Sequence, residues 1–431
     1  MGRRGHMGLL RTVARVSTSA LITLPVLAVA LPARATVGPP ESACQGSGEI
    51  TVEESRLSGE VPQEILRRSG FDTAATDFAD ALCGARNPRA AEAMVRHHGS
   101  RLWRAAVKRA QEVGRATGDL SAGDDRPLYW ARLGMTAALR RWEPSFELSD
   151  NERAELIASL ERWSRGHHQM RFPGDSDITR VVVTGFDPFR LNNDIRQANP
   201  SGAAALALDG TAIETDEGPA VIEAGMFPVR WRDFTEGIVE HALLPHYTGH
   251  RPADLVITVS QGREGRFDLE AYNGAWRGGG TDNLMVGVSG QIPIPEGVPT
   301  VEPQPQWSPS TLDREAIVDA AAGPFPVIDN TQVTEIPAGE TEPVVRPDGP
   351  TPGSRAVAGG GGDYLSNEIA YRNTLLRDAT GREIPAGHVH TPVLHFGAGN
   401  GGDVTDDVFE RNRTEIVEQV RSIVAEAAAH R

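Results

Sequence analysis

The 431-residue sequence is poor in cysteine and in lysine. Its two cysteines, Cys44 and Cys83, lie in the first fifth of the chain, and Lys108 is the only lysine. With no thiol beyond residue 83, most of the chain has neither a cysteine nucleophile nor a cysteine-based metal site. The sequence also has no Walker phosphate loop, no Ser-x-x-Lys motif and no Gly-x-Ser-x-Gly elbow, which excludes the enzyme classes that depend on them.

Positive charge is scarce as well. The chain has 43 Lys and Arg against 58 Asp and Glu, so its formal net charge is −15 at pH 7. A surface this acidic repels phosphate backbones, which argues against a nucleic-acid partner. Hydrophobic residues make up 39% of the chain, enough for a sizeable core, and the length allows two or three domains.

The first 35 residues have the composition of an export signal. Four arginines precede the apolar run 20–31, and Ala-Arg-Ala at 33–35 is a small-x-small cleavage site. We expect a signal peptide over 1–35, a flexible lead over 36–53, and a secreted protein that keeps no membrane segment after cleavage. An uncleaved anchor is the alternative, although the apolar run is short for a membrane span. Cleavage removes five arginines and no acid, so the net charge becomes −20.

Both cysteines follow this signal. An oxidising compartment would allow Cys44 and Cys83 to pair as a disulfide. Two free buried thiols are the alternative.

Residues 54–170 have a helical pattern without strand-like alternation. Apolar side chains between residues 89 and 116 recur near a 3.6-residue period. Ser149, followed three residues later by Glu152, predicts a capping box at the start of a further helix. We therefore expect an all-helical N-terminal domain, and we find no catalytic pattern in it.

From residue 177 onward, apolar strands alternate with helices. Strands are predicted at 178–184, 220–229, 253–259 and 389–396, and helices from 200, over 231–244, from 365 and over 408–429. Strands that are apolar on both faces favour a mostly parallel sheet covered on both sides. The expected fold over 177–431 is a three-layer α/β/α domain. Its Pro-, Glu- and Thr-rich insertion at about 293–350 is interpreted as a partly mobile surface excursion.

Two motifs in the last 50 residues allow competing interpretations. Residues 397–402 match Gly-x-Gly-x-x-Gly, but only one helix follows, so no second strand can supply a ribose-binding acid. We interpret them as a glycine loop and expect no cofactor. His388 and His390 share one face of a strand, and with His395 or Asp403 they could form a zinc site.

A third pattern combines a nucleophile, a base and an acid. Ser366 follows the glycine run 359–362 and opens a helix, where unpaired N–H groups can hold an oxyanion. His390 lies on the next strand and could accept the serine proton, and Glu270, in the loop region after the strand predicted at 253–259, could orient the histidine. A helix cap at Ser366 and a core histidine at 390 are the structural alternatives.

Four segments of the chain resemble pyroglutamyl peptidase I, a family of cysteine peptidases that remove N-terminal pyroglutamate. They are Thr184 to Phe189 with Asn199, Pro200 and Ser201; Val259 to Arg266 with Glu270 and Asn273; Gly362 to Asn367 with Tyr371; and Gly387 to Pro392. The resemblance covers roughly residues 177–427 and none of the N-terminal 176. It implies the fold expected above.

The resemblance also implies roles for individual residues. The family's Cys-His-Glu site falls on Ser366, His390 and Glu270, with serine in place of the catalytic cysteine. The two phenylalanines that grip the flat pyroglutamyl ring fall on Phe186 and Phe189.

Gln261 and Asn199 lie in the matching segments and complete the implied substrate-binding set. The family's double glycine after the second phenylalanine is replaced by Arg190 and Leu191, and an arginine there would favour a carboxylate-bearing substrate. The spacing around Glu270 is loose, so Glu264 and Asp268 are further candidates for the acid.

Three functions are compatible with these residues. The first is an exported hydrolase that removes pyroglutamate, or cleaves a related amide, with Ser366 as nucleophile and a peptide or small amide as substrate. The second is a binding protein on the same fold that has lost its chemistry, as the missing cysteine suggests. The third is a metal hydrolase built on His388 and His390. The oligomeric state is left open.

Overall fold

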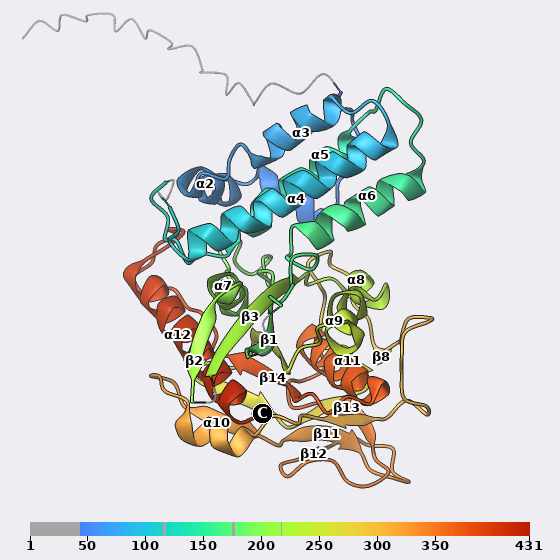
Figure 1. Cartoon of the computed structure of the whole chain (residues 1–431), viewed down its shortest axis with the longest axis vertical. Helices are drawn as coiled ribbons and strands as arrows, with labels where there is room; N and C mark the ends of the chain where they lie inside the picture. Colours follow the sequence, from blue (N-terminus) through green and yellow to red (C-terminus); the bar gives the residue numbers. More distant parts are fainter. Residues whose placement is uncertain (1–43, 115–117, 175–176, 217) are drawn as a thin grey trace, which may run out of the picture. The chain divides into compact units, whose positions relative to one another are not determined.

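The computed structural model describes residues 44–114, 118–174, 177–216 and 218–431 (Figure 1). The predicted signal peptide and residues 36–43 of the predicted lead lie outside the described residues. From Cys44 onward the described chain belongs to one compact unit. None of its described helices is both long enough and apolar enough to span a lipid bilayer.

The first part of the described chain is helical, as its periodicity predicts (Figure 1). Its elements are α1 (Val52–Ser55), η1 (Arg56–Ser58), α2 (Glu60–Ser69), α3 (Ala74–Cys83), α4 (Pro88–Ala110), α5 (Arg126–Arg141) and α6 (Asp150–Trp163). The predicted capping box is present, because the Ser149 side chain accepts from Glu152 N and the Glu152 carboxylate accepts from Ser149 N. Buried Trp103, Trp130 and Trp142 lie in the hydrophobic core that these helices form.

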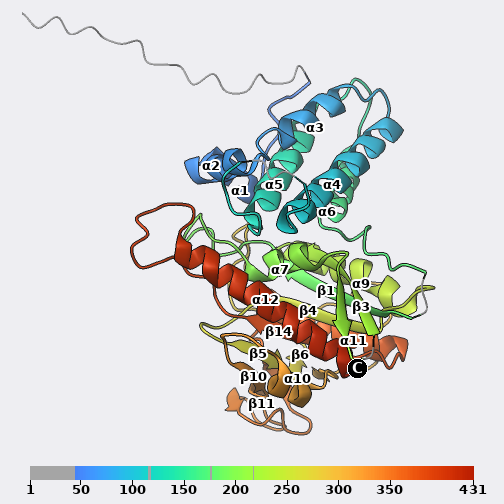
Figure 2. The same ribbon diagram turned by 60° about the vertical axis from the view of Figure 1, so that its left-hand side comes forward.

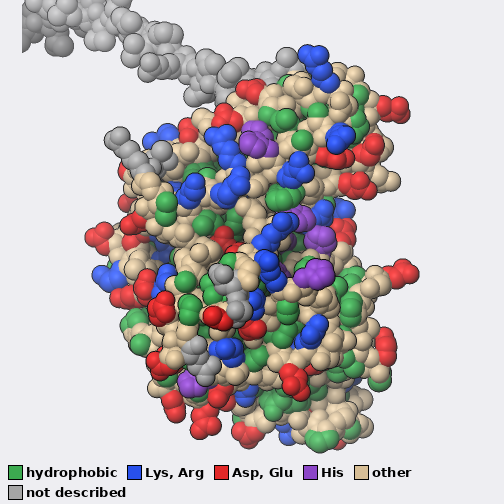
Figure 3. All heavy atoms as spheres, viewed as in Figure 1, with side chains coloured by type: hydrophobic (Ala, Val, Ile, Leu, Met, Phe, Trp, Pro, Cys, Tyr) green, Lys and Arg blue, Asp and Glu red, His purple; other side chains and the backbone are tan. Residues whose placement is uncertain are grey.

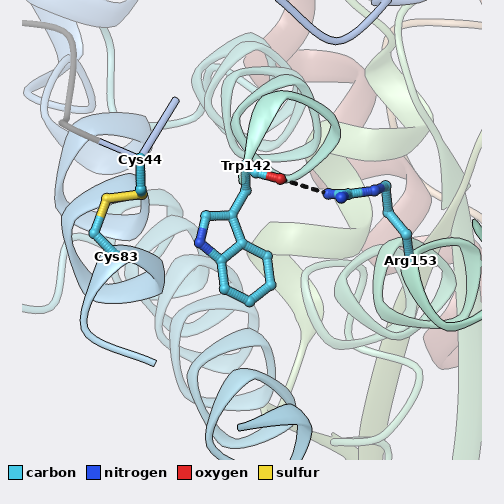
Figure 4. Close-up of a disulfide and its surroundings, with 4 residues drawn as sticks. All are labelled: Cys44, Cys83, Trp142 and Arg153. Carbon is cyan, nitrogen blue, oxygen red and sulfur yellow. Dashed lines mark hydrogen bonds between the residues drawn. A yellow bond between two sulfur atoms is a disulfide. The ribbon is translucent and has the colours of Figure 1, made fainter. Parts of the chain in front are cut away.

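A disulfide joins Cys44 to Cys83 at the end of α3 (Figure 4). Behind it, the Trp142 carbonyl at the end of α5 accepts a hydrogen bond of 2.9 Å from Arg153 of α6. A cross-link between residues 39 positions apart restricts the unfolded chain and is worth about 4 kcal/mol in the loop-entropy account. The lead is thereby attached covalently to the helices.

The rest of the chain forms a three-layer α/β/α structure, which confirms the predicted fold class (Figures 1 and 2). Seven strands pair in the order β10-β5-β14-β4-β1-β3-β2. They are β1 (Thr179–Phe186), β2 (Ala212–Thr215), β3 (Gly218–Phe227), β4 (Leu255–Gln261), β5 (Phe267–Glu270), β10 (Val327–Asn330) and β14 (Ala386–Thr391). The four central strands are parallel, while β2 and β5 run antiparallel to their neighbours β3 and β14.

Alternate residues of the central strands face two different helix layers. Val181 and Val183 pack in the same cluster as α7 (Pro200–Leu208) and α12 (Asp407–Ala429). Val182 packs with α8 (Trp231–Thr235), α9 (Ile238–Thr248) and α11 (Leu365–Thr380) on the other face. Strands apolar on both faces are what a covered parallel sheet requires.

Short elements complete the domain. They are β6 (Tyr272–Gly274), β7 (Trp276–Arg277), β8 (Gly290–Gln291), β9 (Trp307–Pro309), α10 (Arg314–Ala320), β11 (Val333–Ile336), β12 (Val344–Arg346) and β13 (Arg355–Ala358). Strands β12, β11 and β13 form a small separate sheet, and β6 pairs with β9.

Four details differ from the sequence prediction. The helix predicted over 231–244 is divided by Gly237, whose φ of 83° is left-handed. The last strand ends at Thr391 and not at 396, because Pro392 has no N–H for the ladder. Glu270 lies in a strand and not in a loop. The insertion is more than a surface excursion, because it supplies β10 to the main sheet.

A candidate active site at the end of the central sheet

The site is centred on His390, one residue before the end of strand β14. Its Nδ1 lies 2.6 Å from Oε1 of Glu270 on the antiparallel neighbour β5. The two side chains are 4% and 1% exposed, so the pair is shielded from water. An ionised carboxylate only accepts, so Nδ1 carries the proton and Nε2 is left as the basic nitrogen. No described residue hydrogen-bonds to Nε2 of His390.

The second oxygen of Glu270 is also held. Asn330 at the end of β10 donates from Nδ2 to Oε2 at 2.7 Å and to the Gly360 carbonyl at 3.0 Å. The sequence analysis missed Asn330, because it lies inside the insertion and belongs to none of the four resembling segments. A carboxylate fixed through both oxygens holds the imidazole in one orientation.

The other candidate acids have different partners. Asp268 is directly opposite His390 in the strand register, yet its carboxylate pairs with Arg263 at 2.8 Å and Arg266 at 3.0 Å. Glu264 lies 3.6 Å from the exposed ring of His395. Glu270 is therefore the acid behind His390.

The glycine run before α11 lies against these residues. A Cβ on Gly359 would come within 2.1 Å of Asn367 Oδ1, one on Gly360 within 2.1 Å of Glu270 Oε2, and one on Gly361 within 2.6 Å of His390 Cε1. Gly262 packs equally closely against His390. The run thus brings its backbone into van der Waals contact with the acid and the base, an approach that only glycine allows.

Ser366 lies in the first turn of α11, directly after this run. No side chain caps the helix, so the N–H groups of its first turn are left for another acceptor. Ser366 and His390 both line a hollow of about 530 Å³. In this structure the Ser366 hydroxyl donates to the Gly361 carbonyl at 3.2 Å, and it makes no hydrogen bond to the described His390 ring.

The implied substrate-binding residues divide into two groups. Phe189 and Gln261 line the hollow, and Oε1 of Gln261 is buried with no hydrogen-bond partner among the described residues. Phe186 is instead 3% exposed and packs in the core, stacked on Phe234 at 6.1 Å between ring centroids. Asn199 is buried and caps α7.

These positions correct the predicted aromatic pair. Phe186 does not line the hollow, and the ring nearest to Phe189 there is Tyr364, at 6.4 Å between centroids. The sequence analysis did not single out Tyr364. It could have been found from the segment Gly362 to Asn367, which contains it and resembles the family's nucleophile region. Asn199 does not line the hollow either. Its Nδ2 donates to the Asp187 carbonyl at 2.9 Å, so it supports the loop before Phe189 and does not face a substrate.

His388 differs from His390 although both lie on one strand. Its Nδ1 lies 2.8 Å from Thr258 Oγ1, and its Nε2 lies 2.8 Å from Ser260 Oγ. Burial, with a smaller contribution from His390, holds the pKa of His388 well below its ordinary value. A neutral ring with both nitrogens occupied is a structural histidine. Among the described residues no group of three or more His, Cys, Asp and Glu side chains is arranged to hold a metal ion.

The helical region reaches the site through a buried ionic network. Asp187, which follows β1, pairs with Arg132 of α5 and lies 2.7 Å from Arg165. Glu161 of α6 pairs with Arg165 at 2.8 Å and with Arg230 at 3.0 Å. Burial alone would raise the pKa of Glu161, but Arg230, Arg165 and Arg132 outweigh burial and hold it below its ordinary value. The loop that begins at Asp187 is therefore held to the helical region by ion pairs with Arg132 and Arg165.

A second contact involves the first helical turn. Glu53 of α1 accepts from Tyr129 at 2.9 Å and from Asn283 Nδ2 at 3.1 Å. Asn283 in turn donates to the Pro188 carbonyl at 2.9 Å. Residues from three remote segments thus fix the loop that carries Phe189.

Two family models match the chain. The model described as the PA0049 N-terminal domain matches residues 33–161, and the one described as the PA0049 C-terminal domain matches residues 180–305 and 320–395. The uncharacterized protein PA0049 of Pseudomonas aeruginosa is 32% identical, over 96% of this chain and 98% of its own length.

Solved structures that are similar to the chain include two peptidases. A mutant pyrrolidone carboxyl peptidase from Pyrococcus furiosus is 19% identical with a TM-score of 0.36. Pyroglutamyl peptidase I from Bacillus amyloliquefaciens is 20% identical with a TM-score of 0.37. Each comparison covers 58% of this chain and 98% of the peptidase.

Proposed function

This chain belongs to the PA0049 family, and we propose that it is an amide hydrolase of the pyroglutamyl-peptidase type with Ser366 as its nucleophile. The observation that carries the proposal is the His390–Glu270 pair, 2.6 Å apart, beside a hollow that Ser366 also lines. A base oriented by a buried acid next to a hydroxyl is the arrangement that acyl transfer to serine requires.

The proposed reaction has two halves. Ser366 Oγ attacks the substrate carbonyl while His390 Nε2 takes the hydroxyl proton, and the first-turn N–H groups of α11 receive the developing oxyanion. His390 then returns that proton to the leaving amine, and the acyl group stays on Ser366. Water, deprotonated by the same nitrogen, releases the acid and restores the serine.

The hydroxyl must turn before it can react. It donates to the Gly361 carbonyl, so the proposed reaction requires a rotation about the Ser366 Cα–Cβ bond that brings the oxygen to His390 Nε2. Catalytic hydrogen bonds that are absent in a free enzyme often form only when substrate is bound.

The same hydrogen bond favours a second candidate function, a binding protein that has kept the fold and lost its chemistry. In that case the 3.2 Å bond to Gly361 is the permanent position of the hydroxyl. A serine also cannot be ionised beside a histidine as a thiol can.

The test is turnover of a pyroglutamyl-coumarin amide by the wild type, Ser366→Ala, Ser366→Cys and the exposed control Ser47→Ala. We expect activity in the wild type and the control, and a loss of about a thousandfold in Ser366→Ala. A fluorophosphonate should label the peptide that contains Ser366. An inactive wild type that becomes active as Ser366→Cys would establish the second function. Loss of wild-type activity with a chelator would favour the metal hypothesis.

We also propose that the protein works outside the cytoplasm. The export-type sequence of residues 1–35 supports this, as does the bond between Cys44 and Cys83, which an oxidising compartment would preserve. Fractionation of cells that express the full chain tests it. Recovery of an uncleaved, reduced protein from the cytoplasm would contradict it.

A further inference from the structure

Three arginines line the hollow, and two of them, Arg190 and Arg56, make no ion pair with a described residue. Arg190 follows Phe189 in the loop after β1, and Arg56 comes from η1 in the helical region. Arg56 donates to the Asn283 carbonyl at 2.7 Å and to Asn192 Oδ1 at 2.9 Å, so it contacts the same loop that carries Arg190. We call Phe189, Arg190, Asn192 and Arg56 the mouth wall.

Neither guanidinium is neutralised. Among the described residues no carboxylate lies within 4.0 Å of Arg56 or Arg190, whereas Arg263, which also lines the hollow, pairs with Asp268. The contact made by Arg190 is a cation–π interaction with Phe189, 6.0 Å from the ring centroid. Two unpaired cations thus face one hollow in a chain whose net charge is −15.

The nearest acid does not compete for them. Asp282 is the one carboxylate that lines the described hollow, and it is 4% exposed. Its oxygens accept from three backbone N–H groups, those of Trp231 at 2.9 Å, Leu284 at 2.9 Å and Val286 at 3.0 Å. A carboxylate satisfied in this way leaves the arginines available for another anion.

The backbone at Arg190 adds an independent observation. Its φ is 60°, the left-handed region that glycine adopts without strain. Arginine is not glycine, so the chain accepts a strained conformation at a position that presents a guanidinium to the hollow. Strain of this kind is stored mainly where function requires the side chain.

We propose that Arg56 and Arg190 form an anion subsite that binds a carboxylate of the substrate. The preferred substrate class is then an amide that carries a free carboxylate, for example an acyclic glutaryl-type acyl group, and the neutral pyroglutamyl lactam is the weaker substrate. This refinement rests on the proposed amide hydrolysis at the same hollow. It also gives the helical region a role, because that region contributes one of the two cations.

Binding can be tested without turnover. Titration calorimetry of Ser366→Ala compares glutarate with glutaramide, which has the same length and no charge. We expect glutarate to bind, glutaramide to bind at least about tenfold more weakly, and the difference to shrink as salt rises. Arg190→Gln and Arg56→Gln should each remove about tenfold of the glutarate affinity, while the exposed control Arg411→Gln on α12 should not.

Turnover provides the second measurement. Glutaryl-coumarin and pyroglutamyl-coumarin amides are compared in the wild type and in Arg190→Gln, and the ratio of their kcat/KM values should fall about tenfold in the variant. Equal affinity for glutarate and glutaramide, or an unchanged affinity in Arg190→Gln, overturns the subsite. If neither amide is cleaved while glutarate still binds through Arg190, the hydrolase proposal fails and the subsite stands.

Discussion

The two sides of the hollow are built in different ways. We call His390, Glu270, Asn330, Gly360 and Gly361 the base wall. It is made of buried strand ends and a glycine run, and the Glu270 carboxylate is held through both oxygens while no described residue hydrogen-bonds to His390 Nε2. The mouth wall carries side chains that are partly or fully exposed, and its two arginines lack carboxylate partners.

In the proposed function this difference separates two tasks. Proton transfer requires atoms fixed to within a fraction of an ångström, which a packed sheet edge supplies. Selection of a substrate requires exposed groups that a ligand can reach and neutralise. The loop of the mouth wall is nevertheless held in place, because Asp187 at its start pairs with Arg132 and Arg165 of the helical region.

The largest expected effect is on the base wall and uses its two histidines. His390→Ala should lower kcat by about a thousandfold or more, because in the proposed reaction it removes the base that accepts the Ser366 proton. His388→Ala should keep most of the activity and lower the melting temperature, since the Thr258 and Ser260 hydroxyls lose their partner. Equal losses of activity in the two variants would remove the distinction between them.

The anchor of the mouth wall should contribute mainly to stability. Arg132→Met leaves the buried Asp187 with Arg165 alone and should cost about 3–5 kcal/mol of unfolding free energy, measured by denaturant titration. The matched control is Arg232→Met, which breaks an exposed pair with Glu236 and should cost well under about 1 kcal/mol. Similar costs in both variants would mean that the network does not hold the loop.

A smaller effect is expected from one methyl group in the base wall. Gly361→Ala places a Cβ within 2.6 Å of His390 Cε1, so the ring must move and kcat should fall about a hundredfold with little change in KM. Gly399→Ala is the control, because a Cβ there meets nothing within 4 Å and its φ is not left-handed. A fully active Gly361→Ala would show that the ring tolerates displacement.

The smallest effect concerns the orientation of the acid. Asn330→Ala removes the donor to Glu270 Oε2 and should lower kcat about tenfold, because Glu270 gains freedom while it keeps its contact with His390. A positioning role predicts that the pH profile of kcat also shifts, whereas a purely structural role would change only the melting temperature. Asn330→Asp puts a second carboxylate beside Glu270. The apparent pKa read from the pH profile of kcat should therefore rise, because added negative charge favours the protonated forms of the groups beside it.

The sequence was sufficient for the fold class, and it also singled out three residues of the proposed site. Burial of strands on both faces leaves continuous apolar runs, and these predicted the parallel sheet. Ser366, His390 and Glu270 were found because each lies in a short segment that resembles a known family. The structure places His390 against Glu270 and puts Ser366 in the same hollow.

Pattern reasoning failed where partners depend on distant pairing. His390 faces Asp268 in the strand register, but its ring contacts Glu270, and Asn330 comes to Glu270 from a strand 60 residues away. Phe186 and Phe189 are three residues apart, one at the end of β1 and the other in the loop after it, yet Phe186 packs in the core and Phe189 lines the hollow. No local pattern distinguishes them, because the backbone direction after β1 is set by Asp187 and its distant arginines.

By itself the sequence determined the helical and α/β regions, the parallel strands, and which residues can transfer protons or attack a carbonyl. These follow from local hydrophobic periodicity and side-chain chemistry, which each segment carries alone. Only the tertiary structure decided which acid supports His390, that Asn330 holds that acid, and that Arg56 of the helical region lines the hollow. Such contacts join segments through space, and their free energy depends on burial and strand register that exist only once the whole chain has folded.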